Sequence, residues 1–108
     1  MPNGADNVVV VAEPFEGAAV DAWGRVIAEA VASRPGRLVI DLRHSSLLDA
    51  AAIAVLLQAH RAMVHAGGRL VLRAPTDRVR RILRLAGLME VFEFEQAQGA
   101  EMGPACCN

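Results

Sequence analysis

The sequence alternates short, uninterrupted apolar runs with longer segments in which apolar residues recur every three or four positions. Val8–Val11 and Leu38–Ile40 are two such runs, and an unbroken apolar run is typical of a strand that is covered on both faces. Between them, the apolar residues from Val20 to Val31 follow helical spacing. Strands separated by helices of this length pair in parallel through right-handed crossovers. The pattern therefore predicts an α/β fold, an open and mostly parallel sheet with helices packed on it.

Four strands and three helices are expected in one domain, residues 1–96. The strands are predicted at 8–11, 37–42, 69–73 and 91–94, and the helices at about 20–33, 50–66 and 77–86. Asp49 and Thr76 are the predicted helix caps, since both residue types accept hydrogen bonds from the first helical turn. Residues 97–108 are predicted to be a flexible tail, and both cysteines, Cys106 and Cys107, lie in it.

Composition gives no support to several classes of partner. The net charge of −1 gives no reason to expect nucleic acid or an anionic membrane. All eleven basic residues are arginine, which we interpret as codon usage. No apolar segment reaches the roughly 18 residues that a membrane span needs, and residues 1–7 do not resemble a signal peptide. The expected location is therefore the cytoplasm.

The second predicted helix carries apolar residues on two sides. One stripe, predicted to face the core, consists of Ile53, Leu56, Leu57 and Val64. A second stripe of smaller residues consists of Ala51, Val55, Ala59 and Ala62. This second stripe could dock another protein, or it could be a solvated face on which alanine simply favours the helix.

A candidate functional site follows the second predicted strand. Ligands and modifications of open α/β sheets gather at the carboxyl ends of the strands. Here that position holds the loop from Asp41 to Asp49, with Ser45 and Ser46, and the start of the next helix. A helix N-terminus also suits a phosphate group, because its backbone N–H groups lack helical partners.

The residues from Leu38 to Asp49, read as LVIDLRHSSLLD, resemble the central motif of the STAS domain family. In that motif a strand ending in Asp-Leu is followed by a loop and by Asp-Ser-Ser-Gly at the start of a helix. Further matches follow in order at 66–72, Pro75, 79–83 and 86–92. The resemblance implies a STAS-like fold and the function of an anti-sigma factor antagonist. Such a protein binds an anti-sigma factor and thereby releases a sigma factor.

The sequence departs from this family at one functional position. Asp-Ser-Ser-Gly is replaced by Asp49-Ala50-Ala51-Ala52. In the phosphorylated antagonists the first serine accepts phosphate from the partner, a serine kinase, and Ala50 at that position has no hydroxyl group. The resemblance places partner binding in this region: Ser45, Ser46, Asp49, Ala50, Ala51, Ala52, Ile53 and Val55. Ser46 is a possible substitute acceptor, although a hydroxyl in a turn more often bonds nearby backbone.

Two alternatives stay open. The chain could be a non-catalytic adaptor in a signalling assembly or a lipid-transport complex, with other STAS proteins or a second copy of itself as partners. It could also bind a nucleotide through the arginine-rich third helix, but it has no glycine-rich phosphate loop.

We predict no enzymatic activity, no cofactor and no metal. His44, Ser45 and Asp49 lack the nucleophile elbow of a hydrolase. His60 and His65 are five residues apart, which places them on different faces of a helix.

Overall fold

The computed structural model describes residues 6–96 as one parallel sheet with three helices. The helices and strands follow one another as β1 (Asp6–Val10), α1 (Ala18–Ala32), β2 (Arg37–Asp41), α2 (Ala50–His65), β3 (Arg69–Arg73), α3 (Asp77–Leu85) and β4 (Glu93–Glu95). The strand order is β1-β2-β3-β4, and every neighbouring pair is parallel. The predicted fold class is therefore confirmed. The predicted tail, 97–108, and its two cysteines lie outside the described residues.

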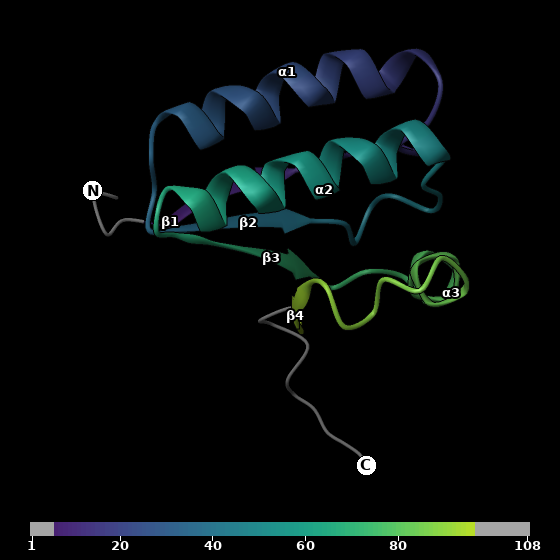
Figure 1. Cartoon of the computed structure of the whole chain (residues 1–108). Coiled ribbons are helices and arrows are strands. Elements are labelled where there is room, and N and C mark those ends of the chain that lie inside the picture. Colours follow the sequence, from purple (N-terminus) through teal and green to yellow (C-terminus); the bar gives the residue numbers. More distant parts are fainter. Residues whose placement is uncertain (1–5, 97–108) are drawn as a thin grey trace.

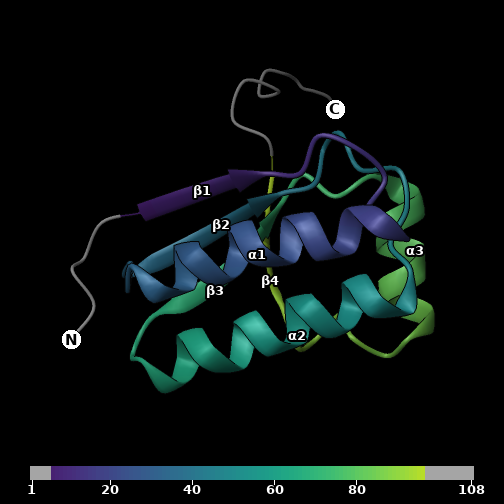
Figure 2. The same cartoon turned by 90° about the horizontal axis from the view of Figure 1, so that it is seen from above.

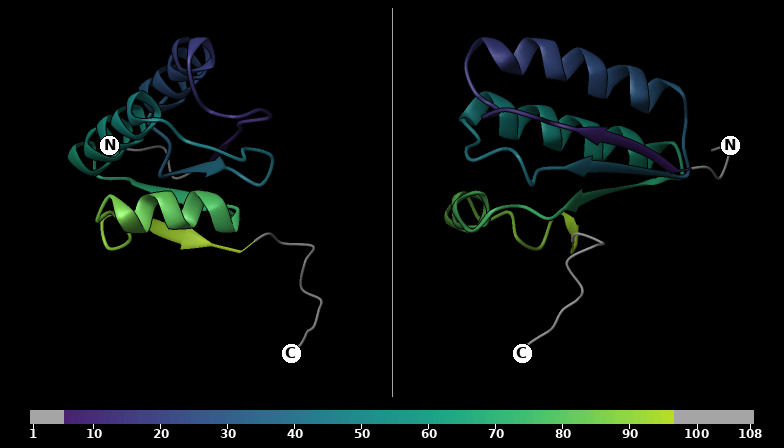
Figure 3. Two further views of the ribbon diagram at one scale, coloured as in Figure 1. Left: turned by 90° about the vertical axis from the view of Figure 1, so that its right-hand side faces the viewer. Right: turned by 180° about the vertical axis from the view of Figure 1, so that it is seen from behind.

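The helices do not cover the two faces of the sheet equally. α1 and α2 lie side by side on one face, and α3 lies beyond the carboxyl ends of the strands (Figures 1 and 2). Leu38 and Ile40 of β2 and Leu70 and Leu72 of β3 point into the core beneath α1 and α2. The end-on view shows the opposite face without a covering helix (Figure 3).

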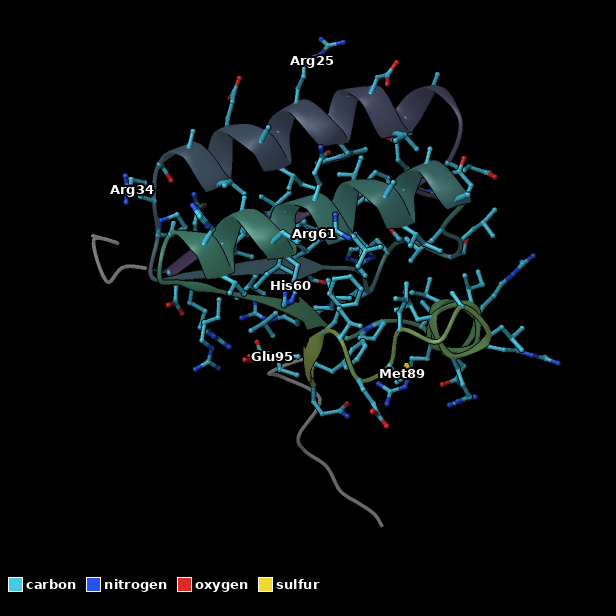
Figure 4. All side chains as sticks on the ribbon, in the orientation of Figure 1. Arg25, Arg34, His60, Arg61, Met89 and Glu95 are labelled. Carbon is cyan, nitrogen blue, oxygen red and sulfur yellow. The ribbon has the colours of Figure 1, made fainter. Side chains whose placement is uncertain are left out.

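Ion pairs line this uncovered face. Arg37 bonds Asp6 and Glu95, while Arg73 Nε lies 2.6 Å from Glu95 Oε2. Figure 4 shows Glu95 on the side of the sheet away from α1 and α2. Arg69 and Glu93 add a further pair, at 2.9 Å. The central strands are therefore covered by charged side chains on one face and by helices on the other, which explains their unbroken apolar runs.

The prediction that β1 is buried on both faces is wrong. Val9 is buried, whereas the side chains of Val8 and Val10 are 44% and 42% exposed. The reason is position: β1 is the outer strand of the described sheet, and the face to which Val8 and Val10 belong has no helix over it. The last strand also differs from its predicted range of 91–94, since pairing with β3 begins only at Glu93.

The core-facing side of α2 also differs from the predicted stripe. Its buried residues are Ala52, Leu56, Ala59 and Met63. Val64 is 57% exposed instead. The sequence pattern favoured the larger side chains, but the small residues Ala52 and Ala59 let α2 approach its neighbours closely. The predicted caps are confirmed, since Asp49 and Thr76 cap their helices. Gly67 follows α2 with a positive φ of 86°.

Candidate functional site

The loops that leave β1 and β2 are joined by backbone hydrogen bonds. The N–H of Phe15 donates to Leu47 O at 2.9 Å, and the N–H of Asp49 donates to Phe15 O at 3.2 Å. These bonds form an isolated parallel bridge between Phe15 and Leu48, and both side chains are buried. The start of α2 is therefore held to the segment that precedes α1, at the carboxyl edge of the sheet.

Asp49 connects the starts of the two helices. Its Oδ1 accepts a hydrogen bond from the N–H of Ala52 at 2.9 Å, which is a helix cap. Its Oδ2 accepts a second bond, also at 2.9 Å, from the N–H of Gly17 before α1. Gly17 has φ 57° and ψ −134°, a conformation that glycine adopts readily. The Gly17 and Ala52 bonds stabilise the carboxylate form and lower the pKa of Asp49.

We expect Asp49 to make stability fall more steeply in acid. Because its pKa is lowered in the folded state, its contribution is complete above the unfolded value of about 3.9 and is lost as the pH falls through the folded value. Thermal unfolding of the parent and of Asp49→Asn, followed by Trp23 fluorescence, should differ most near neutral pH. The two melting temperatures should converge as the pH falls from about 4 through the lowered pKa of Asp49. Asp21→Asn, an aspartate change in the first turn of α1, is the control, and a constant gap at all pH values would contradict the prediction.

Ser45 does not lie on the surface, contrary to its predicted place in a partner-binding site. Its side chain is fully buried, and its hydroxyl contacts two backbone carbonyl oxygens, Val11 O at 3.1 Å and Glu13 O at 2.8 Å. The hydroxyl therefore ties the loop after β2 to the loop after β1. In this position Ser45 offers no accessible surface and instead fixes the shape of the loop.

The other predicted site residues divide by exposure. Ser46, Ala50 and Ala51 are exposed, whereas Ile53 and Val55 are half-buried. Ala52 is fully buried, and its N–H donates to Asp49, as the predicted helix cap requires. The accessible surface at the start of α2 is therefore made by Ser46 and two alanine methyl groups, with Ile53 and Val55 beside it. We call this the α2 entry surface.

The histidines do not form a catalytic group with the site. His44 is exposed, while the Ser45 hydroxyl is engaged by backbone carbonyl groups. His60 is half-buried and stacks edge-on against Phe92, with the ring centroids 5.6 Å apart. Figure 4 shows His60 on α2, on the side toward the sheet. Within residues 6–96, no three His, Cys, Asp or Glu side chains are close enough to hold a metal ion.

The second stripe of α2 faces a groove that the sequence did not reveal. Val55, Ala59 and Ala62 line it together with Val20, Gly24 and Ala28 of α1, and it has a volume of about 490 Å³. Gly24 lies close to Val55, because a Cβ built on Gly24 would be 3.6 Å from a Val55 methyl carbon. Ala59 is therefore a core residue, and Ala62 an exposed one at the border of the groove. The pairing of α1 with α2 could not be read from α2 alone.

The family follows from comparison with known sequences. The STAS domain profile matches residues 3–100, nearly the whole chain. This chain belongs to the STAS family. Comparison with curated proteins finds no match. No helix within the described residues is long and apolar enough to cross a membrane.

Solved structures agree with the STAS fold. The anti-sigma factor antagonist SpoIIAA, in its unphosphorylated form, has a TM-score of 0.75 and 20% identity over 94% of this chain and 87% of that chain. A protein of Thermotoga maritima, provisionally assigned as an anti-sigma factor antagonist, has a TM-score of 0.77 and 16% identity, covering 93% and 88% of the two chains. At these identities the likeness establishes the fold, and the STAS motif positions guide which residues to test.

Proposed function

We propose that this STAS domain is an anti-sigma factor antagonist that binds an anti-sigma factor of the serine-kinase type through the α2 entry surface. Binding would release a sigma factor by competition, without catalysis by this chain. The family assignment and the fold shared with SpoIIAA support a role in protein binding. The joined loops support the choice of surface, because the hydrogen bonds between them hold the start of α2 in one fixed geometry.

The exposed methyl group of Ala50 carries this proposal. Ala50 is the first residue of α2, directly after the Asp49 cap. Ala50 has no hydroxyl group that could accept phosphate. Of the two serines in the preceding loop, Ser45 is buried. The surface therefore stays small and uncharged at the position where the phosphorylated antagonists carry their switch. We infer that the chain remains permanently in the binding state.

Ala50→Asp should abolish binding to the anti-sigma factor. An aspartate at the first helical position is compatible with α2, because a negative charge is favourable at a helix N-terminus. The loss would therefore report on the partner contact. It should exceed 100-fold in the dissociation constant, or about 2.7 kcal/mol. The measurement is capture from a native cell lysate with mass spectrometry, followed by calorimetry with the captured kinase.

Ala22→Asp is the matched control, since Ala22 is an exposed helical alanine on α1, outside the α2 entry surface. It should bind like the parent. Equal binding by Ala50→Asp would show that the α2 entry surface is not the interface. If Ala50→Asp and Ala22→Asp capture other STAS proteins or transporter subunits equally well, the result would instead support the adaptor function.

Ser46 is the remaining hydroxyl at the α2 entry surface. It is exposed, three residues before Asp49. We expect Ser46→Ala to bind the kinase as the parent does, and the parent to take up no phosphate on incubation with kinase and ATP. Phosphorylation that disappears in Ser46→Ala would identify Ser46 as a substitute acceptor and restore a switch to this protein.

A further inference from the structure

The outer edge of β1 has the features of a site for one more strand. The N–H of Val11 donates to Asp41 O at 3.1 Å, on the side of β2. Backbone groups of successive strand residues point to alternate sides. The N–H and C=O groups of Val8 and Val10 therefore point away from β2, and no strand within residues 6–96 pairs with them. Figure 2 shows β1 as the outermost strand.

Exposed valines lie on both sides of this edge. Val8 and Val10 are 44% and 42% exposed on the uncovered face of the sheet. On the helical face a groove of about 410 Å³ runs beside β1, lined by residues 7–10, by the apolar Trp23, Val26 and Ala30 of α1, and by the polar Glu29 and Ser33. Val26 is 43% exposed. Three of the six large exposed apolar residues of the described chain therefore border the same edge, and an added strand would lie beside them.

β1 carries few of the devices that keep sheet edges apart. Native edges are usually blocked by lysine, proline, bulges or inward-pointing charges. β1 reads Asp-Asn-Val-Val-Val, and its one charged side chain, Asp6, is paired with Arg37 at 2.8 Å. A strand that would fit beside the exposed valines must be apolar on both faces, and the run Val8–Val11 itself has this property.

We propose that a second copy of this chain occupies the edge, with the two β1 strands antiparallel and related by a two-fold axis at Val9. Val8 of each copy then lies opposite Val10 of the other, and both residues exchange backbone hydrogen bonds across the axis. The four valines meet on the uncovered face as cross-strand pairs. Asp6 lies opposite Ala12, so the register places no charged residue against its own copy. A two-fold interface needs only this one self-complementary surface.

The dimer would have one sheet running through both copies. Because the two β1 strands are antiparallel, the carboxyl edges of the two halves point in opposite directions. The two α2 entry surfaces would then lie at opposite ends, each free for its own partner. This inference does not depend on the proposed function, because it uses β1 and α1 alone.

Sedimentation of the full chain over a concentration series tests the dimer. The parent should change from monomer to dimer with a dissociation constant in the range of about 1–100 μM, since a strand-edge contact is small. Val8→Lys places a charge at an exposed edge position and should weaken the dimer at least tenfold. Val10→Pro removes one outward-pointing N–H and leaves the ladder with β2 intact, so it should also give monomer. Val64→Lys, at an exposed valine of α2, should dimerise like the parent.

Amide hydrogen exchange assigns the surface. In the parent at high concentration, the N–H groups of Val8 and Val10 should be protected, and dilution or Val8→Lys should remove that protection. Three results would overturn the proposal: a parent that stays monomeric at about 1 mM, a dimer whose Val8 and Val10 amides exchange freely, or a dimer that both β1 variants leave unchanged. Protection of these amides in a monomer would overturn it as well, by showing that the chain covers its own edge.

Discussion

Leu56→Ala should lower the free energy of unfolding by about 3 to 4 kcal/mol. Leu56 is fully buried at the centre of α2, in the same core cluster as Leu38, Leu70 and Val79. Truncation removes the transfer free energy of the side chain and leaves a cavity between elements that cannot close fully. Because alanine and leucine both favour helices, the loss would come from packing and not from helix propensity. Urea unfolding monitored by Trp23 fluorescence measures the change.

Two leucines of the same chain serve as matched controls. Leu57 is half-buried on the next position of α2, and Leu57→Ala should cost clearly less than Leu56→Ala. Leu85 is 81% exposed at the end of α3, and Leu85→Ala should change stability by less than about 0.5 kcal/mol. Equal losses at Leu56 and Leu57 would mean that α2 is rotated about its axis from this orientation. Such a rotation would also turn Ala50 toward the core and Ala51 further into solvent.

The fold could be predicted from the sequence because its strongest signals are local. The central strands are continuous apolar runs, and Asp49, Thr76 and Gly67 have local roles that their residue types favour. Exposure of Val8 and Val10 depends on strand order, which no local pattern specifies. A run of valines looks the same at the centre of a sheet and at its edge.

The candidate site could be located from the sequence but not resolved into its parts. The loop after β2 can be located because parallel strands place their carboxyl ends together. Burial of Ser45 cannot be predicted locally, since its acceptors, Val11 and Glu13, are more than thirty residues away. The second bond of Asp49, to Gly17, was missed for the same reason. A glycine just before a helix carries no signal of a carboxylate so far along the chain.

Ala50→Ser should convert this protein into a phosphate acceptor. This expectation depends on the proposed function, and the kinase captured by the parent supplies the test. A serine at the first position of α2 would present its hydroxyl on the exposed surface that Ala50 occupies. The helix N-terminus would stabilise the phosphate, whereas the neighbouring Asp49 carboxylate, whose pKa is lowered, would oppose it. Because these two effects oppose each other, the phosphate should leave the fold intact. Its bulk and charge at the contact should instead displace the partner.

Mass spectrometry after incubation with the kinase and ATP should show one added phosphate on Ala50→Ser and none on the parent. Ala51→Ser carries the same change at the next exposed position, and it should stay unmodified if acceptance depends on geometry. The phosphorylated Ala50→Ser variant should no longer bind the kinase, and removal of the phosphate by a phosphatase should restore binding. Equal phosphorylation of parent and variant would place the acceptor elsewhere. The binding state would then be switched after all, and the absence of a hydroxyl at Ala50 would no longer explain it.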